Sequence, residues 1–388
     1  MKRKYRPEKK WYGVYRFFDS MFYRIPKVEA CNICNAKKIL ISYPHLLGDS
    51  VLLTPFLFEL RRVCPFAQID LVGDKFCETV LNPLGIVNHF YNFGSSGGMH
   101  GVKQMIRNRR EISNAIKQIR DDVYDVAIDP FCDWGASYLL KKSKAKQKIG
   151  FDFFGFDYLY SYTVAAQDSI EHIVDDMLYM LNEISSESVN LHCVYPRICL
   201  GKEQKEFAEE QVKKLGLVGK YVIGVHPGAS QQSKKWTGYG DLVKRVNTQY
   251  NEVQFLIFEG PGEAETIDLL FEEFDDKVKE SCKRVKLPLD KYIATLAICN
   301  VVICNDSSCG HLTAALEIPV VVIYGQGCPD YIGVRSERAS VEIVDVKNVD
   351  CKPCYQDICP NGNLKCIAPI TVDEVYRRVE KIIDEHRG

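Results

Sequence analysis

The chain has 388 residues, and its 50 basic and 51 acidic side chains leave a formal net charge of −1 at pH 7. This near-neutral balance argues against a protein whose main partner is a nucleic acid or another polyanion. Hydrophobic residues make up 46% and charged residues 26%, as in a globular protein of two or three domains, and 16 cysteines are too dilute for a small disulfide scaffold.

The first segment, residues 1–35, differs from the rest of the chain. Residues 1–29 carry nine Lys or Arg against three Asp or Glu, interleaved with eight aromatic residues. Such a segment suits the surface of an anionic membrane, or it packs as a helix on the body of the protein. It has no apolar stretch typical of a secretory signal, and no run of about 18 apolar residues follows. We therefore expect a cytoplasmic protein, peripheral on a membrane if the first alternative holds, with most cysteines as thiols.

From Lys37 onward, short apolar runs alternate with amphipathic segments. The apolar runs predict strands at 37–44, 68–74, 125–130, 220–227, 253–260, 300–306 and 318–325. The amphipathic segments predict helices at about 55–63, 102–120, 171–184, 202–215, 239–249, 263–276, 289–298, 308–317 and 371–386. This alternation predicts an α/β protein with parallel sheets. Because an irregular stretch at 185–201 separates two blocks, we expect two Rossmann-like domains, 36–200 and 201–388, facing each other across a cleft.

In open α/β sheets, ligands bind outside the carboxyl ends of the strands, so the loops there carry the candidate chemistry. The first such loop contains Asp49. It has only Gly48 of a dinucleotide fingerprint and lacks the Gly-Lys-Ser/Thr of a phosphate-binding loop. Asp49 is either a general base facing the cleft or part of the turn and cap that open the next helix.

Two loops of the second block contain small residues. The loop after the strand at 220–227 has candidate ligand contacts at His226, Gly228 and Ser230. Lys234 and Lys235 follow and could meet a diphosphate, although paired lysines are often solvated surface. The loop after 253–260 holds Glu259 and Gly260 in a predicted tight turn, where the carboxylate could accept hydrogen bonds from a base or a ribose.

The fourth loop lies between a strand and the helix predicted at 308–317. Its candidate residues are Asp306, Ser307, Ser308, Gly310 and His311. A helix N-terminus offers unpaired N–H groups and a partial positive charge, which favours phosphate. The alternatives are simple N-capping by the Asp or the first Ser, and a core histidine. No Asp-x-Asp metal motif stands out, so lysine and helix amides would neutralise a diphosphate.

The order of these loops resembles that of the glycosyltransferase family 9 heptosyltransferases of lipopolysaccharide core assembly, over about residues 37–386. The matching stretches are LISYPHLLGDSV, IGVHPGAS, LIFEGPGE and ICNDSSCGH. The resemblance implies a GT-B fold, with the acceptor bound mainly by the first domain and the nucleotide sugar by the second. It also implies an inverting transfer without a catalytic metal, usually from ADP-heptose.

The resemblance also assigns roles by position. Asp49 matches the catalytic base of the family, and Lys234, with Lys235 as its neighbouring candidate, matches the lysine that meets the donor phosphates. The residues that match the donor-binding helix terminus are Asp306, Ser307, Ser308 and His311. Family members commonly have Gly where this chain has Ser308, a departure that bears on the donor sugar.

Three kinds of function are consistent with these features. The first is transfer of heptose to a lipid-linked inner-core saccharide at the cytoplasmic face of the inner membrane, which the basic N-terminal segment fits. The second is protein O-heptosyl transfer to an autotransporter-like polypeptide. The third is a non-catalytic GT-B scaffold or sugar-binding protein, disfavoured because the candidate base, lysine and aspartate are all retained.

Four of the cysteines are gathered near the C-terminus with the spacing C-x2-C-x4-C-x6-C. They are Cys351, Cys354, Cys359 and Cys366. Four thiolates at such spacing can hold zinc or iron in a structural site, as an iron-binding cysteine segment does in a related branch that glycosylates autotransporters. The alternative is a loop of free thiols or a local disulfide.

Overall fold

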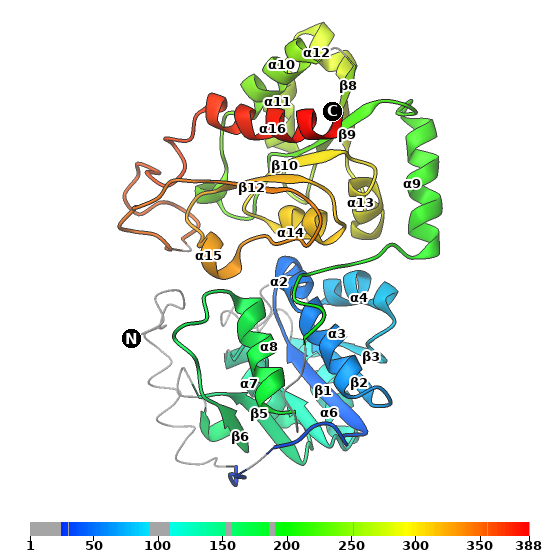
Figure 1. Cartoon of the computed structure of the whole chain (residues 1–388), viewed down its shortest axis with the longest axis vertical. Coiled ribbons are helices and arrows are strands. Elements are labelled where there is room, and N and C mark those ends of the chain that lie inside the picture. The colour runs from blue at the N-terminus through cyan, green and yellow to red at the C-terminus, as the bar shows by residue number, and fades with distance from the viewer. Residues whose placement is uncertain are drawn as a thin grey trace. The chain divides into compact units, whose positions relative to one another are not determined.

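The computed structural model describes residues 25–29, 31–93, 109–132, 134–152, 157–185, 191–250, 252–354 and 356–387. The chain forms two compact units, Met1–Pro196 and Arg197–Gly388 (Figure 1). Most of the basic N-terminal segment, residues 1–24, lies outside the described residues. Its last part belongs to the first unit, because Ile33 is fully buried and its N–H donates to the carbonyl of Ile184 at 3.0 Å.

The first unit contains a parallel sheet with the strand order β3-β2-β1-β4-β5-β6. The strands are β1 (Lys38–Tyr43), β2 (Gln68–Gly73), β3 (His89–Asn92), β4 (Val126–Ile128), β5 (Gln147–Phe151) and β6 (Tyr162–Val164). The helices are α2 (Leu47–Leu52), α3 (Thr54–Val63), α4 (Lys75–Leu81), α6 (Arg109–Asp121), α7 (Trp134–Lys142) and α8 (Ile173–Glu183), with short 3-10 turns η1 (Asn82–Leu84) and η2 (Asp157–Leu159). Helices α3 and α8 pack against each other, as do α6 and α7.

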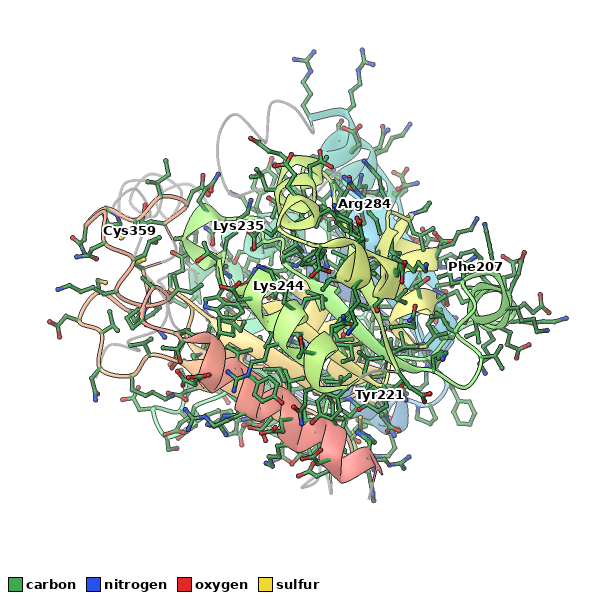
Figure 2. All side chains as sticks on the ribbon, turned by 90° about the horizontal axis from the view of Figure 1, so that it is seen from above. Phe207, Tyr221, Lys235, Lys244, Arg284 and Cys359 are labelled. Atoms are coloured by element: carbon green, nitrogen blue, oxygen red, sulfur yellow. The ribbon has the colours of Figure 1, made fainter. Side chains whose placement is uncertain are left out.

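The second unit repeats this design with the order β12-β11-β10-β7-β8-β9. Its strands are β7 (Tyr221–His226), β8 (Val253–Phe258), β9 (Cys282–Val285), β10 (Val301–Asn305), β11 (Val320–Tyr324) and β12 (Val341–Asp345). Its helices are α9 (Lys202–Lys214), η3 (Gln232–Lys234), α10 (Tyr239–Gln249), α11 (Ala264–Glu272), α12 (Asp276–Ser281), α13 (Leu289–Leu296), α14 (Ser308–Ala315), α15 (Pro329–Ile332) and α16 (Val372–Arg387). Helices α10 and α16 pack against each other, with Lys244 of α10 labelled in Figure 2.

Continuous apolar runs explain the central strands. Every residue of β10 and of β11 is buried, as expected for strands covered on both faces of a parallel sheet. All the predicted strands are present, within two residues at each end. The prediction missed β3, β5, β6, β9 and β12, and three of these, β3, β6 and β9, are short strands at or next to a sheet edge with polar residues among their few positions.

The helix predictions need two corrections. The helix predicted at 263–276 is α11, which ends at Glu272, and α12, which follows a break at residues 273–275, was not predicted. Helices α2, α4, α7 and α15 were not predicted at all, and each is short. Of the helix predicted at 102–120, residues 102–108 lie outside the described residues and the rest is α6.

The strand order reverses direction once in each sheet. Counted within its own unit, each sheet has the order 3-2-1-4-5-6, so the reversal falls between β1 and β4 in the first unit and between β7 and β10 in the second. Because the loops after the two strands at such a reversal diverge to opposite faces, they leave an opening for a ligand. The fold therefore directs attention to the loops after β1, β4, β7 and β10.

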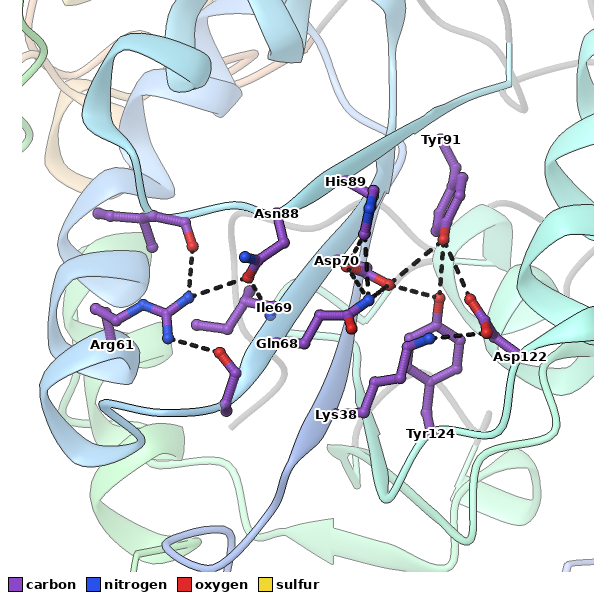
Figure 3. A network of polar contacts seen from close by, with 12 residues as sticks. Lys38, Arg61, Gln68, Ile69, Asp70, Asn88, His89, Tyr91, Asp122 and Tyr124 are labelled. Carbon is purple, nitrogen blue, oxygen red and sulfur yellow. Dashed lines mark hydrogen bonds and ion pairs between the residues drawn. The ribbon is translucent and has the colours of Figure 1, made fainter.

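The amino ends of the strands in the first unit meet in a polar network, far from those loops (Figure 3). Its hub is the fully buried carboxyl of Asp70. This group accepts hydrogen bonds from Tyr124 OH at 3.0 Å and Gln68 Nε2 at 2.9 Å, and its Oδ1 lies 2.9 Å from His89 Nδ1. One carboxyl thus joins β2, β3 and the chain just before β4.

We expect Asp70→Ala to lower the free energy of unfolding by about 2–4 kcal/mol, because it leaves the buried hydroxyl of Tyr124 without its main acceptor. The matched control is Asp122→Ala. The side chain of Asp122 belongs to the same network through Lys38 but is 39% exposed, so its loss should change stability by less than about 1 kcal/mol. Urea unfolding of both variants checks this, and equal losses would contradict it.

Candidate active site

Asp49 lies where the reversal rule places a ligand, on the helix that follows β1. It is the third residue of α2 and is half-buried, and its Oδ2 accepts a hydrogen bond from the N–H of Leu46 at 3.1 Å. The capping role considered from the sequence is therefore real. It does not compete with a role as base, because the two oxygens of a carboxylate offer about four lone-pair sites.

The loop after β4 supplies a second carboxyl that the sequence analysis did not single out. Asp129 is fully buried, and its Oδ1 accepts from Cys132 N at 2.6 Å while its Oδ2 accepts from Tyr160 OH at 2.8 Å. The ring of Phe131 in this loop lies 3.9 Å from that of His45, which follows β1. Asp129 thus fixes one wall of the opening, and these hydrogen bonds occupy both of its carboxylate oxygens.

In the second unit, the predicted lysine and aspartate meet. Lys234 Nζ lies 2.8 Å from Asp306 Oδ2, and the two side chains are only 14% and 5% exposed. Gly327 allows this arrangement, since a Cβ there would lie 2.4 Å from the same Oδ2. The structure therefore brings together a half-buried ammonium and the carboxyl end of β10.

Asn305, the last residue of β10, holds the neighbouring loops in place. Its buried Nδ2 donates to the carbonyl of Pro227 at 2.7 Å, and its Oδ1 accepts from the N–H of Trp236 at 3.1 Å. The two ends of the loop between β7 and α10, which carries Lys234, are thus bound to one amide. Sequence reasoning passed over this residue, although it precedes Asp306 directly.

Helix α14 begins beside this pair with an unused hydroxyl. Ser307 is the N-cap residue, yet its side chain makes no capping bond, and its Oγ is buried without a hydrogen-bond partner. Ser308, the first helical residue, is half-buried. Gly310 lets the helix approach the sheet, since a Cβ there would lie 3.1 Å from the side chain of Val322. An unpartnered hydroxyl beside free helix amides fits an anionic ligand.

His311 lies in the first turn of α14 and is buried. Burial lowers the pKa of its imidazole to about 4, with Lys234 adding to the shift and Asp306 opposing it. The imidazole is therefore neutral at pH 7. The positive charge available to a ligand at this strand end comes from Lys234 and the helix amides, not from His311.

A second cluster forms where β7 and β8 end. His226 Nε2 lies 3.2 Å from Glu263 Oε2, and its Nδ1 lies 2.9 Å from the hydroxyl of Tyr292. Burial alone would lower the pKa of His226, but its hydrogen bonds to Cys309 and Glu263 outweigh burial and raise the pKa to about 10. His226 is therefore an imidazolium paired with a carboxylate.

Glycine is required around this pair. A Cβ at Gly228 would lie 1.9 Å from the carboxyl carbon of Glu263, and one at Gly260 would lie 2.7 Å from its Oε2. The N–H of Gly260 also donates to that oxygen at 2.7 Å. The sequence analysis named both glycines but missed Glu263, whose position three residues after Gly260 is the spacing that such a turn needs.

The remaining predicted donor residues are placed as follows. Glu259 is buried, and its two oxygens pair with Arg284 at 2.6 Å and Lys286 at 2.7 Å. Ser230 is exposed and Lys235 half-buried. Figure 2 shows Lys235 and Arg284 well apart in the second unit. The roles of these residues toward a donor stay predictions.

The cysteine-rich segment contacts the lysine loop. Ser233 donates from its N–H to the carbonyl of Asp357 at 3.0 Å and from its hydroxyl to the carbonyl of Gln356 at 2.5 Å. Cys354 donates to Gln326 Oε1 at 3.2 Å. The segment therefore braces the backbone next to Lys234.

The structure does not form the metal site that the cysteine spacing suggested. Among the described residues, which include all sixteen cysteines, no three Cys, His, Asp or Glu side chains are placed to hold a metal ion, and no disulfide is present. Cys351, Cys354 and Cys359 are half-buried and Cys366 is buried. Figure 2 shows Cys359 in the loop before α16.

The two six-stranded parallel sheets with their helices match solved structures of the GT-B fold. A family 9 glycosyltransferase from Veillonella parvula has the same fold with a TM-score of 0.74 and 21% identity, over 90% of this chain and 98% of that one. The "ADP-heptose lps heptosyltransferase II" of Escherichia coli gives a TM-score of 0.69 and 18% identity, over 90% of this chain and 100% of that one.

Sequence comparison identifies the family. The model described as "Glycosyltransferase family 9 (heptosyltransferase)" matches residues 112–365, and the chain belongs to this family. Lipooligosaccharide heptosyltransferase 2 of Campylobacter jejuni is 25% identical over 89% of this chain and 98% of its own length. Within the described ranges, no helix is both long and apolar enough to cross a membrane.

The pKa of His311 predicts a specific acid sensitivity. Because the folded-state pKa of about 4 lies below the unfolded value of 6.5, the unfolded chain alone binds this proton between those values, and stability falls as the pH drops from 6.5 to 4. The contribution is roughly 3 kcal/mol. Urea unfolding between pH 7 and 4 should show a shallower loss for His311→Gln than for the wild type.

The matched control is His192→Gln, because His192 is exposed and belongs to the other unit. This variant should keep the pH dependence of the wild type. A His311→Gln variant with an unchanged pH dependence would show that the imidazole is not held neutral by burial.

Proposed function

We propose that this glycosyltransferase moves heptose from ADP-heptose to an inner-core lipopolysaccharide acceptor, with inversion and without a catalytic metal. The observation that carries the proposal is the end of β10, where Lys234 lies beside the unpartnered hydroxyl of Ser307 and the amides of α14. An ammonium and a helix terminus together suit a diphosphate. The names of the family and of the relatives above supply the sugar and the acceptor class.

The donor contacts divide between two strand ends in this proposal. Lys234, Ser307 and Ser308 bind the diphosphate, which replaces Asp306 as the partner of the ammonium. His226 and Glu263, at the ends of β7 and β8, bind the nucleoside part of the donor, because a carboxylate can accept hydrogen bonds from the sugar hydroxyls. Glu259 supports this end through its ion pairs.

The reaction is a single displacement. Asp49 of the first unit removes the proton from an acceptor hydroxyl, and that oxygen forms a bond to the anomeric carbon from the face opposite the nucleotide. The bond between this carbon and the diphosphate oxygen breaks as the new bond forms. The negative charge that develops on the departing ADP is stabilised by Lys234 and by the amides at the start of α14.

Asp49→Asn tests the base. Asparagine keeps an oxygen that can accept the hydrogen bond from Leu46, so α2 should remain capped. We expect kcat for heptosyl transfer to fall by about 10²–10⁴-fold while the affinity for ADP-heptose is unchanged. Near-normal turnover, measured by ADP release with acceptor present, would contradict the assignment.

Lys234→Ala and Lys235→Ala test the diphosphate contact as a matched pair. The first should lose about 3–4 kcal/mol of transition-state stabilisation, a 10²–10³-fold fall in kcat, because it removes the ammonium that lies beside Asp306 at the start of α14. The second should change kcat only a few-fold. The reverse ranking would move the contact to Lys235, and thermal unfolding of both variants excludes a folding defect.

We also propose that the basic N-terminal segment holds the enzyme at the cytoplasmic, anionic face of the membrane that carries the acceptor. The net charge of +6 over residues 1–29 and the interleaved aromatic residues support this. The contacts of this segment decide where a truncation should end. Residues from Ile25 onward form hydrogen bonds with the first unit, and Ile33 is buried. A deletion should therefore end at residue 24.

Co-sedimentation with phosphatidylglycerol vesicles compares the full chain with a chain lacking residues 2–24. The full chain should bind at least tenfold more tightly, and high salt should abolish the difference. Equal binding would remove this support for a lipid-linked acceptor and favour a polypeptide acceptor instead.

A further inference from the structure

A recess opens at the carboxyl ends of β2 and β3, beside α4. Its cavity volume is about 10 Å³, room for roughly one hydroxyl-sized group, and its walls include Asp74, Cys77, Glu78 and Asn92. Figure 1 shows these elements together in the first unit. Neither the proposed base nor the donor contacts account for this recess.

Asp74 contributes an unused oxygen to the recess. Its side chain is only 3% exposed, and one oxygen caps α4 by accepting from the N–H of Phe76 at 3.1 Å. The other oxygen, Oδ2, is buried and has no hydrogen-bond partner. Because an unpaired buried carboxyl oxygen is costly, its position in the wall of a recess indicates a ligand.

The recess lies on the same edge of the sheet as Asp49. The strand ends are in register, with Tyr43 of β1 opposite Gly73 of β2, and Gly73 opposite Asn92 of β3. Cys77 of α4 contacts α2, since its Sγ lies 3.1 Å from the hydroxyl of Ser50, the residue after Asp49.

The electrostatics of Cys77 agree with this placement. Burial raises the pKa of its thiol to about 12, and the charges of both Asp74 and Asp49 add to the rise. Gly73 makes room for this contact, because a Cβ there would lie 2.9 Å from the sulfur. The thiol thus lies within electrostatic reach of both carboxylates.

The charges around the recess select the kind of ligand. An anionic group is disfavoured by Asp74 and Glu78, while the ammonium of Lys75 is turned over the ring of Phe76, 4.7 Å from its centre. Within the described part of the chain no three acidic, Cys or His groups converge for a cation. A neutral hydroxyl, which can donate to Oδ2, is the group that fits.

We propose that Asp74 binds a hydroxyl group of the saccharide acceptor and thereby positions the attacking hydroxyl for Asp49. This rests on the proposed function, because it takes the first unit as the acceptor side. Asp74 is an acceptor-binding residue in this proposal and takes no proton in the reaction.

The key variant is Asp74→Ser, because serine is a good N-cap but is too short to reach into the recess. With heptose-deficient lipopolysaccharide, freed of its fatty acids, as acceptor, we expect its KM to rise at least tenfold. The KM for ADP-heptose and the melting temperature should stay at the wild-type values. Asp74→Ala should show the same rise in acceptor KM and also a lower melting temperature.

Asp275→Ala is the matched control. Asp275 caps the short helix α12 by accepting from Val278 N at 2.8 Å, but it is exposed and lies in the other unit. Its loss should leave the acceptor KM unchanged. If Asp74→Ser also keeps the wild-type acceptor KM, Asp74 is a cap only and the proposal is overturned.

The pH dependence gives a second readout. Burial raises the pKa of Asp74 to about 6, against the opposing hydrogen bond from Phe76 and the charge of Lys75. The other titratable groups around the recess are Cys77 and Glu78 of α4 and Tyr91 of β3. The acceptor KM of the wild type should rise as the pH falls through 6, and Asp74→Ser should lack this rise. An identical rise in the variant would overturn the assignment.

Saturation-transfer NMR of the same oligosaccharide with the full chain separates this proposal from the proposed function. Binding that Asp74→Ser weakens supports the recess even if the wild type transfers no heptose, in which case only the transfer activity is wrong. Transfer by the wild type with unchanged binding by the variant overturns the recess alone. Neither transfer nor binding by the wild type overturns both.

Discussion

The buried amide of Asn305 is the contact on which the second unit's site depends. It lies at the reversal point of the sheet and binds the carbonyl of Pro227 and the N–H of Trp236, at the two ends of the loop that carries Lys234. Because both ends of this loop are bound to one planar group beside the start of α14, the loop is held next to Asp306. An amide suits this position since it donates and accepts at once without adding charge beside Asp306.

The two units have the same strand order, but their buried polar groups have different roles. In the first unit, the carboxyls of Asp70 and Asp129 are saturated by hydroxyl and N–H donors and act as structural hubs. Asp49 and Asp74 lie at the carboxyl edge of the sheet, and each accepts a hydrogen bond from a backbone N–H at the start of a helix. The buried Oδ2 of Asp74, by contrast, has no hydrogen-bond partner, and this difference is the basis for the acceptor-binding role proposed for it.

The sequence predicted what depends on local pattern. Runs such as Val320–Tyr324 are apolar throughout and could be identified as buried strands, and the reversal rule pointed to the loops with Asp49 and Asp306. Edge strands such as Cys282–Val285 were not predicted because half of their residues are polar. Glu263 and Asn305 were missed because their partners come from other elements. Asp74 was assigned to the end of a strand, since the short helix that it caps has no clear periodicity.

The hydrogen bonds between the cysteine-rich segment and the loop that carries Lys234 have a consequence for evolution. Ser233 bonds there to the carbonyls of Gln356 and Asp357, which every residue type carries. These two bonds to Ser233 therefore do not depend on which side chains stand at positions 356 and 357. A change in the length of the segment would shift the two carbonyls and break both bonds. For this contact, the length of the segment is more constrained than the identity of these two residues.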